Sequence, residues 1–223
     1  ISTTLGVSVG FWGAELTHAW HAFKEAGYDV TIASPDGGAC QLDVWSDPRD
    51  ESRYSRDDLL TMGFINTPEL WAMVEQTPKL ADLDLAAYDA IVVVGGQGPM
   101  FTFRGNADLE RALRSFYESN RVTAALCHGV AALIDVQLSD GSYLIAGKTM
   151  TGFANVEEEY ADAFVGRQVM PWRIEDAARD RGANYIQSGR FKAFAVRDGR
   201  LITGQQQYSG AETARLVIAA VGT

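Results

Sequence analysis

The chain of 223 residues is poor in the residues that would link it to disulfides, membranes or nucleic acids. Its only cysteines, Cys40 and Cys127, lie far apart, which argues against a disulfide scaffold and for a reducing compartment, so a cytoplasmic protein is expected. Lys and Arg number 19 against 29 Asp and Glu, and the net charge of −10 comes without any basic block. No apolar run approaches the ~18 residues of a membrane span. Neither a nucleic acid nor a membrane is therefore an expected partner.

Histidine is equally scarce, and this limits the metal sites that the sequence can form. The three histidines are His18, His21 and His128. Glu15, His18 and His21 follow one another at three-residue steps, but such steps drift around a helix, and no further His or Cys pair completes a ligand set. We expect no metal site, and we expect His21 at the surface and Cys40 in a structural position.

What is present is an alternation of strand-like and helix-like segments, which predicts an α/β fold with a mostly parallel sheet in one domain, residues 1–223. Ala90–Val94 is a continuous apolar run, as expected of a central parallel strand covered on both faces. Periodicity weakens from about residue 40 to 78, where we expect a small inserted cap. Ile1–Gly6 has neither a basic leader nor an initiator methionine, so we expect the tail of a longer N-terminus and not a signal peptide. The other predicted strands are Tyr28–Ala33, Val122–Leu126 and the hairpin pair Phe191–Val196 and Leu201–Gly204, and the predicted helices are Gly13–Ala26, Arg56–Met62, Pro68–Glu75, Ala107–Ser119, Asn155–Phe164, Pro171–Arg181 and Ser209–Val221.

Cys127 is the most informative residue, because an apolar, β-prone stretch, Val122–Leu126, stops there and a helical pattern begins at His128. A sharp strand-to-helix turn holds a nucleophile above the sheet beside free helix N–H groups. Those groups and the positive end of the helix dipole stabilise a thiolate, the reactive form of cysteine. The alternative is a buried structural cysteine, which is common. Cysteine followed by histidine and glycine at a strand end favours the reactive interpretation, and Cys127 is predicted to be the only reactive thiol.

Several motifs keep their order along nearly the whole chain and together resemble one family. They are Gly10–Leu16 followed by His18, Ala33–Gly38, Tyr88–Gly96, Ala125–Gly129, Lys148–Phe153 followed by Glu157 and Glu158, and Asp198–Gln205. The chain resembles the ThiJ/PfpI superfamily, with its class I glutamine amidotransferase-like fold, and within it the branch of glutathione-independent glyoxalases (glyoxalase III) and related heat-shock chaperones. The resemblance implies a flavodoxin-like, mostly parallel sheet sandwiched by helices, a homodimer, and an enzyme that needs no cofactor.

The resemblance also implies the roles of four side chains. Cys127 becomes the nucleophile, His128 its neighbouring acid or base, and Glu158 the carboxylate that orients the histidine. Glu15 matches the family's acid against the cysteine sulfur, where partial desolvation would raise its pKa and let it hold or move a proton. Taken alone, the acidic run 157–159 fits a solvated helix face, and Glu15 fits an exposed first-turn acid equally well.

Gly95, Gly96 and Gln97, at the end of the central strand, resemble the family's oxyanion loop, and the N–H of His128 can supply a second donor. The run is not a dinucleotide-binding fingerprint, because its glycine spacing is wrong and no acidic residue ends a second strand about 20 positions later. Many relatives have histidine at the position of Gln97. Glutamine can donate a hydrogen bond there but cannot take up a proton, so any proton-transfer role at this position is lost.

The resemblance implies a glyoxalase III-type lyase that converts 2-oxoaldehydes such as methylglyoxal to 2-hydroxy acids, with His18 and Trp12 lining the pocket for this small electrophile. A cysteine-dependent hydratase, hydrolase or lyase on a bulkier molecule is an alternative, since Phe11, Trp172 and Tyr208 can also line the site. A holdase chaperone or redox-responsive stress protein is a third. A glutaminase is disfavoured, because that triad needs a histidine well downstream of the cysteine and the chain has none there.

Overall fold

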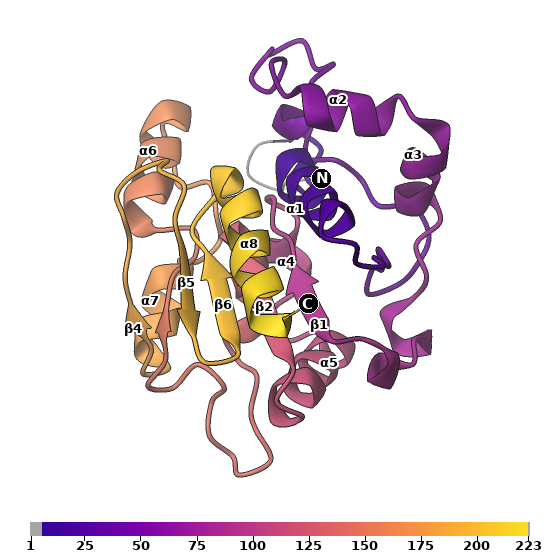
Figure 1. The fold of residues 1–223 in the computed structure, drawn as a ribbon. Helices are drawn as coiled ribbons and strands as arrows, with labels where there is room; N and C mark the ends of the chain where they lie inside the picture. Colours follow the sequence, from indigo (N-terminus) through magenta and orange to yellow (C-terminus); the bar gives the residue numbers. More distant parts are fainter. Residues whose placement is uncertain (1–5, 223) are drawn as a thin grey trace.

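The computed structural model describes residues 6–222, and its centre is a four-stranded sheet with the strand order β1–β2–β6–β5 (Figure 1). The first three strands in this order are parallel, and β5 pairs antiparallel with β6. A second, two-stranded sheet pairs β3 with β4 in parallel. The protein therefore has a mixed α/β fold built on a mostly parallel sheet. The strands are β1 (Ala90–Val93), β2 (Val122–Leu126), β3 (Thr149–Met150), β4 (Asn184–Tyr185), β5 (Ala195–Asp198) and β6 (Leu201–Gly204).

Helices cover both faces of the main sheet (Figure 1). The α-helices are α1 (Gly13–Glu25), α2 (Leu59–Ile65), α3 (Pro68–Glu75), α4 (Pro99–Thr102), α5 (Ala107–Glu118), α6 (Asn155–Val165), α7 (Ile174–Asp180) and α8 (Gly210–Val221). The 3₁₀ helices are η1 (Val44–Ser46), η2 (Leu80–Asp82), η3 (Leu85–Ala87), η4 (Cys127–Leu133) and η5 (Gln207–Ser209). On one face, Phe23 of α1 and Val217 of α8 share an apolar cluster with Ala124 of β2. On the other face, a larger apolar cluster includes residues of α5, η4 and α7. With apolar clusters on both faces of the sheet, β2 is buried at every position.

Residues 40–78 contain η1, α2 and α3, which lie on the α1 side of the sheet (Figure 1). The Thr17 hydroxyl on α1 and the Thr61 hydroxyl on α2 are hydrogen-bonded at 2.7 Å, which ties this segment to the body of the domain. α3 occupies the predicted residues, with Pro68 in its first turn. α2 begins later than predicted, after Asp58, because the Asp58 carboxylate accepts a hydrogen bond from the Thr61 N–H and caps the helix there.

One predicted strand is wrong, and one predicted helix is present in a narrower form. Tyr28–Ala33 forms no strand, because no described segment offers it a continuous row of hydrogen bonds, and pairing is confined to a single bridge between Ser34 and Lys79. The helix expected from His128 is the 3₁₀ helix η4. This turn is pressed against β1, since a Cβ on Gly129 would lie 2.6 Å from the Val93 carbonyl oxygen, and the narrower 3₁₀ geometry fits the space.

The other predicted helices and strands are confirmed, with ends that shift by a few residues. The C-terminal hairpin is shorter than predicted, since its first strand begins at Ala195. Between residues 6 and 222, no helix combines the length and the apolar character needed to cross a bilayer.

Candidate active site

Cys127 lies at the sharp turn where β2 ends. Its φ of +55° lies in the left-handed region, which is uncommon for residues other than glycine. The side chain is buried, with 2% of its surface exposed. The backbone N–H groups of Gly96 and His128 donate hydrogen bonds to its sulfur. Backbone strain of this kind is concentrated at functional sites, and the strand-to-turn geometry is that of a nucleophile elbow.

Gly95 and Gly96 let the end of β1 approach the cysteine turn. A Cβ on Gly95 would lie 2.7 Å from the His128 nitrogen and 2.9 Å from the Cys127 Cβ. Gly96 has a φ of +108°, and a Cβ there would lie 2.3 Å from the Gly10 carbonyl oxygen. All three contacts are shorter than real Cβ atoms make, so only glycine at positions 95 and 96 lets the end of β1 lie this close to the cysteine turn and to Gly10.

His128 joins the thiol to a buried carboxylate. Its Nδ1 lies 3.7 Å from the Cys127 Sγ, and its Nε2 lies 3.1 Å from the Glu158 Oε1. The imidazole ring stacks on Phe153, with 4.1 Å between ring centroids. The other carboxylate oxygen of Glu158 lies 3.3 Å from Arg173 Nη1, so Glu158 is paired with a permanent positive charge. The structure thus brings together Cys127, His128 and Glu158. The histidine ring is held by Glu158 at its edge and by Phe153 on its face.

Glu15 reaches the same thiol from α1. It is fully buried, its Oε2 accepts a hydrogen bond of 2.6 Å from the Gly95 N–H, and its carboxyl group is hydrogen-bonded to the Cys127 thiol. Burial raises the pKa of Glu15 from 4.5 to about 8, although these hydrogen bonds lower it. Burial, followed by the nearby charge of Glu15, raises the pKa of the Cys127 thiol well above its usual value. The two groups therefore compete for one negative charge, and Glu15 is mainly a neutral acid at pH 7.

Asp43 is a buried acid that sequence reasoning did not single out. Its Oδ2 accepts a hydrogen bond of 3.0 Å from the Gln97 N–H, and its Oδ1 accepts one of 3.3 Å from Gln97 Nε2. Burial raises the pKa of Asp43 from 3.8 to about 6, against the hydrogen bonds and the charge of His128, which lower it. Gln97 Oε1 is buried and has no donor among the described residues. Asp43 thus fixes the position of Gln97 and of the preceding residue, Gly96, whose N–H donates to the cysteine sulfur.

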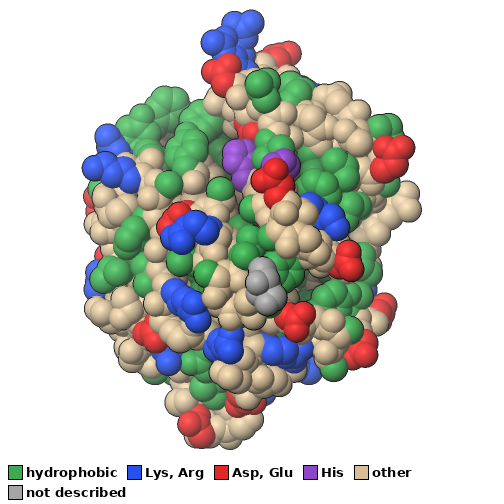
Figure 2. Space-filling model, in the orientation of Figure 1, with side chains coloured by type: hydrophobic (Ala, Val, Ile, Leu, Met, Phe, Trp, Pro, Cys, Tyr) green, Lys and Arg blue, Asp and Glu red, His purple; other side chains and the backbone are tan. Residues whose placement is uncertain are grey.

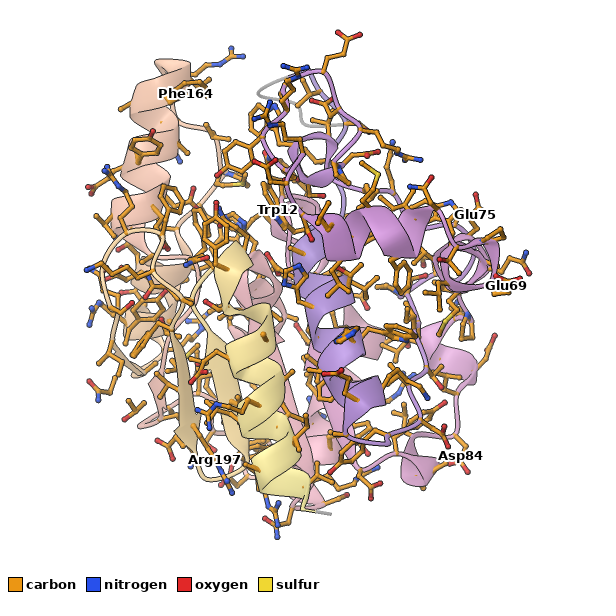
Figure 3. The ribbon with its side chains drawn as sticks, turned by 45° about the horizontal axis from the view of Figure 1, so that its top comes forward. Trp12, Glu69, Glu75, Asp84, Phe164 and Arg197 are labelled. Atoms are coloured by element: carbon orange, nitrogen blue, oxygen red, sulfur yellow. The ribbon has the colours of Figure 1, made fainter. Side chains whose placement is uncertain are left out.

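Trp12 directly precedes α1 and His18 lies on it, and the two side chains differ in their surroundings. The Trp12 N–H donates to the Gly95 carbonyl at 2.9 Å, and its ring meets Tyr54 edge-on, with 5.9 Å between centroids. Figure 3 labels Trp12 at the amino end of α1. The His18 Nε2 is instead hydrogen-bonded to Asp58 at 2.9 Å, and the structure does not join it to the thiol. His21 lies beside Glu25, and residues 6–222 gather no set of His, Cys, Asp and Glu that could hold a metal ion.

The acidic run at the start of α6 divides into three environments. Glu158 alone contacts the histidine. Glu157 is buried, and its carboxylate accepts hydrogen bonds from the N–H groups of Ala154 and Phe191 and from Gln205 Nε2. Glu159 is exposed. Glu157 therefore ties the start of α6 to the segment before β5 and leaves Glu158 facing the site.

Sequence reasoning missed Asp43, Phe153 and Arg173. Phe153 ends the Lys148–Phe153 motif, so a signal for it existed. Asp43 falls in the weakly periodic segment 40–78, and Arg173 is the residue directly before α7. Only the fold places Asp43 beside Gln97 and Arg173 beside Glu158, and no local sequence pattern indicates either contact.

Labelling with iodoacetamide tests the order of thiol reactivity. Cys127 is buried and the pKa of its thiol is raised well above the usual value, whereas Cys40 is half-exposed, so we expect Cys40 to be alkylated ahead of Cys127 in the folded protein at pH 7. Mass spectrometry of the tryptic peptides should find that alkylation of Cys127 is slow at pH 7 and accelerates as the pH is raised above 9. Rapid alkylation of Cys127 at pH 7 would contradict the buried, protonated thiol.

Comparisons with known proteins agree with this geometry. Residues 5–220 match the sequence model of the DJ-1/PfpI family. Glyoxalase 3 of Candida albicans is 30% identical, and the match covers 96% of this chain and 91% of that protein. The crystal structure of glyoxalase III from the same yeast has a TM-score of 0.79 at 29% identity, covering 95% of this chain and 88% of that one. The Rapid Encystment Protein of Francisella tularensis has a TM-score of 0.88 at 28% identity, with 100% and 95% covered.

Proposed function

Because the chain belongs to the DJ-1/PfpI family, we propose that it is a cysteine-dependent, glutathione-independent glyoxalase that converts 2-oxoaldehydes to 2-hydroxy acids. The observation that supports this proposal most directly is the full burial of the Glu15 carboxyl group beside the Cys127 thiol, which raises the pKa of Glu15 to about 8. Isomerisation of an oxoaldehyde needs a proton donor that becomes a proton acceptor within one turnover, and an acid with a pKa of about 8 fits both tasks. The names of the yeast relatives point to the same reaction.

The first half of the reaction forms a carbon–sulfur bond. The reactive species is the minor form of the singly protonated pair, in which the proton rests on Glu15 and the charge on sulfur, because the raised pKa of the thiol keeps the proton mainly on sulfur. The thiolate attacks the aldehyde carbon of methylglyoxal, and the aldehyde oxygen develops negative charge within reach of the Gly96 and His128 N–H groups. Glu15 then gives its proton to that oxygen, which yields a hemithioacetal and leaves Glu15 as a carboxylate.

The second half moves hydrogen from one carbon to the next. The Glu15 carboxylate removes the proton from the former aldehyde carbon, and the negative charge moves to the neighbouring oxygen to give an enediolate. Glu15 returns a proton to the neighbouring carbon while the hydroxyl proton moves from the first oxygen to the second, which gives the thioester of a 2-hydroxy acid. His128, oriented by Glu158, then activates a water molecule that hydrolyses the thioester. The products are lactate and the regenerated thiol, so the net change is addition of one water to methylglyoxal.

Turnover of methylglyoxal in D₂O without glutathione tests this proposal. We expect lactate, detected by NMR, with deuterium at carbon 2, because the enediol exchanges its protons with the acid residues and through them with solvent. Lactate with only protium at carbon 2 would point to a hydride shift and would exclude the Glu15 route. Absence of lactate, together with turnover of a larger electrophile from a panel, would favour the bulkier-substrate hydrolase or hydratase.

Exposed apolar side chains favour one second candidate, a holdase chaperone. On α6, the side chain of Phe164 is 80% exposed and that of Tyr160 is also exposed. Figure 3 labels Phe164 on this helix, and Figure 2 shows apolar side chains gathered at the upper left of the molecule, over the same region. A holdase needs such surface but does not need the thiol, so the two functions separate in a variant that lacks Cys127.

A further inference from the structure

Asp43 is a buried acid to which the proposed reaction gives no task. The residue is fully buried. Its carboxylate accepts hydrogen bonds from the Trp45 N–H, the Gln97 N–H and Gln97 Nε2, and all three donors are neutral. Burying a carboxylate among neutral donors is costly, so stability alone favours an uncharged residue at this position. A costly charge close to a reactive thiol indicates a role in the chemistry.

The backbone around Asp43 is held in place without the carboxylate. The Asp43 N–H donates to the Phe11 carbonyl at 2.8 Å. Phe11 directly precedes Trp12, whose N–H donates to the Gly95 carbonyl. These backbone contacts already join the segment around Asp43 to the residues that follow β1, so the carboxylate is not needed to dock this segment.

The loop that follows β1 is fixed at its two ends and in its middle. Backbone hydrogen bonds to the segment before α1 hold the ends, at Gly95 and at Gly98. The middle residue, Gln97, is held by two hydrogen bonds to the Asp43 carboxylate. Gly96 has a wide conformational range because it has no side chain, so the contact at Gln97 decides where the Gly96 N–H points.

The charge of Asp43 also acts on the titratable groups of the site. Burial is the main cause of the raised pKa of Glu15, on α1, and the charge of Asp43 raises that pKa further. Burial raises the pKa of Asp43 itself to about 6, against the charge of His128, at the start of η4, which lowers it. Asp43 is therefore mainly ionised at pH 7, and its charge opposes ionisation of the Glu15–Cys127 pair.

We propose that Asp43 is a positioning residue for the glyoxalase reaction. Through Gln97 it directs the Gly96 N–H at the sulfur and at the aldehyde oxygen, and its negative charge favours the protonated form of Glu15. The role rests on the proposed function, because the oxyanion and the proton donor belong to that reaction. Asp43 acts through Gln97 and Glu15, not on the substrate.

Turnover of methylglyoxal by Asp43→Ala and Asp43→Asn tests the hydrogen-bonding part of this role. Alanine removes the acceptor for the Gln97 N–H, so we expect kcat to fall on the order of 10²-fold with a much smaller change in KM. Asparagine keeps an acceptor oxygen for that N–H, and most of the lost kcat should return. The matched control is Asp57→Asn in the segment 40–78, where the side chain is 91% exposed, and its turnover should equal that of the wild type.

Alkylation of Cys127 by iodoacetamide tests the role of the charge without any substrate. Asp43→Asn removes a negative charge that opposes ionisation of the Glu15–Cys127 pair. The rise of alkylation with pH should therefore move to lower pH, by on the order of one unit. Asp57→Asn should leave the profile unchanged. A purely structural role of Asp43 would not move it.

Two results would each overturn the proposal. One is wild-type kcat in Asp43→Ala, with its fold checked by thermal unfolding, and the other is an unmoved alkylation profile in Asp43→Asn. Should Asp43→Ala fail to fold, the profile of Asp43→Asn decides, because that variant keeps an acceptor for Gln97. Absence of lactate formation by the wild type would instead overturn the proposed function, and the alkylation profile would still decide whether the charge of Asp43 acts on the thiol.

Discussion

Replacement of Cys127 by alanine is expected to reduce turnover of methylglyoxal to the uncatalysed rate, a loss on the order of 10⁴-fold or more. The proposed reaction forms its carbon–sulfur bond at this atom, and no other thiol is available, because Cys40 lies elsewhere, near Thr77. Lactate formation measured under saturating methylglyoxal, without glutathione, gives the rate. The N–H groups of Gly96 and His128 remain in place, but they have no nucleophile to assist.

The matched control is Cys40→Ala, which should retain wild-type turnover. Thermal unfolding of both variants checks the fold, since alanine at position 127 must still adopt a φ of +55°. A Cys127→Ala variant that folds and keeps its turnover would refute cysteine dependence. Suppression of aggregation of an unfolded client protein should be equal in this variant and the wild type if α6 provides holdase surface, and that result separates the chaperone function from the chemistry.

Local patterns predicted the helices well because capping and periodicity are local. Pro68 fits the first turn of α3, and the stretch from Gly210 to Val221 carries apolar residues at helical spacing with Gly222 after it. The end of β2 at Cys127 was also predictable, since a continuous apolar run stops there. The fold class follows from the alternation of such segments and needs no knowledge of long-range contacts.

Long-range contacts decide what the sequence did not predict. Tyr28–Ala33 has the composition of a strand, but a strand needs a partner, and the described residues offer this part of the chain only the single bridge between Ser34 and Lys79. Asp43 and Arg173 lie in segments without periodic patterns. Only the folded chain shows that Asp43 accepts a hydrogen bond from the Gln97 N–H and that Arg173 pairs with Glu158. Burial likewise gives Glu15 a pKa of about 8, a value that depends on every layer packed around it.

The second large effect is expected for Glu15→Gln, which should lower the rate of methylglyoxal turnover on the order of 10²–10⁴-fold. Glutamine keeps the shape of the side chain, can accept the hydrogen bond from the Gly95 N–H and can donate one to the sulfur. It cannot pass a proton to the aldehyde oxygen or remove one from carbon. Alkylation of Cys127 should therefore change much less than turnover. The matched control is Glu25→Gln on the same helix, whose exposed side chain lies beside His21.

The same substitution should change how stability depends on pH. Folding raises the pKa of Glu15 from 4.5 to about 8, so in that range the folded state holds a proton that the unfolded state has released, and stability falls as the pH rises. Asp43 acts in the same direction only up to about pH 6. Between pH 6 and 8 the loss due to Glu15 amounts to at most about 1.4 kcal/mol per pH unit.

Urea unfolding at pH 6 and pH 8 measures this slope in both proteins. The wild type should lose stability over the interval, whereas Glu15→Gln should lose less and be the more stable protein at pH 8, because it folds without taking up a proton at this position. A variant with wild-type turnover and an unchanged pH slope would show that Glu15 is ionised in the folded protein. The neutral acid beside the thiol, and with it the enediol route, would then be wrong, leaving a simpler cysteine hydrolase.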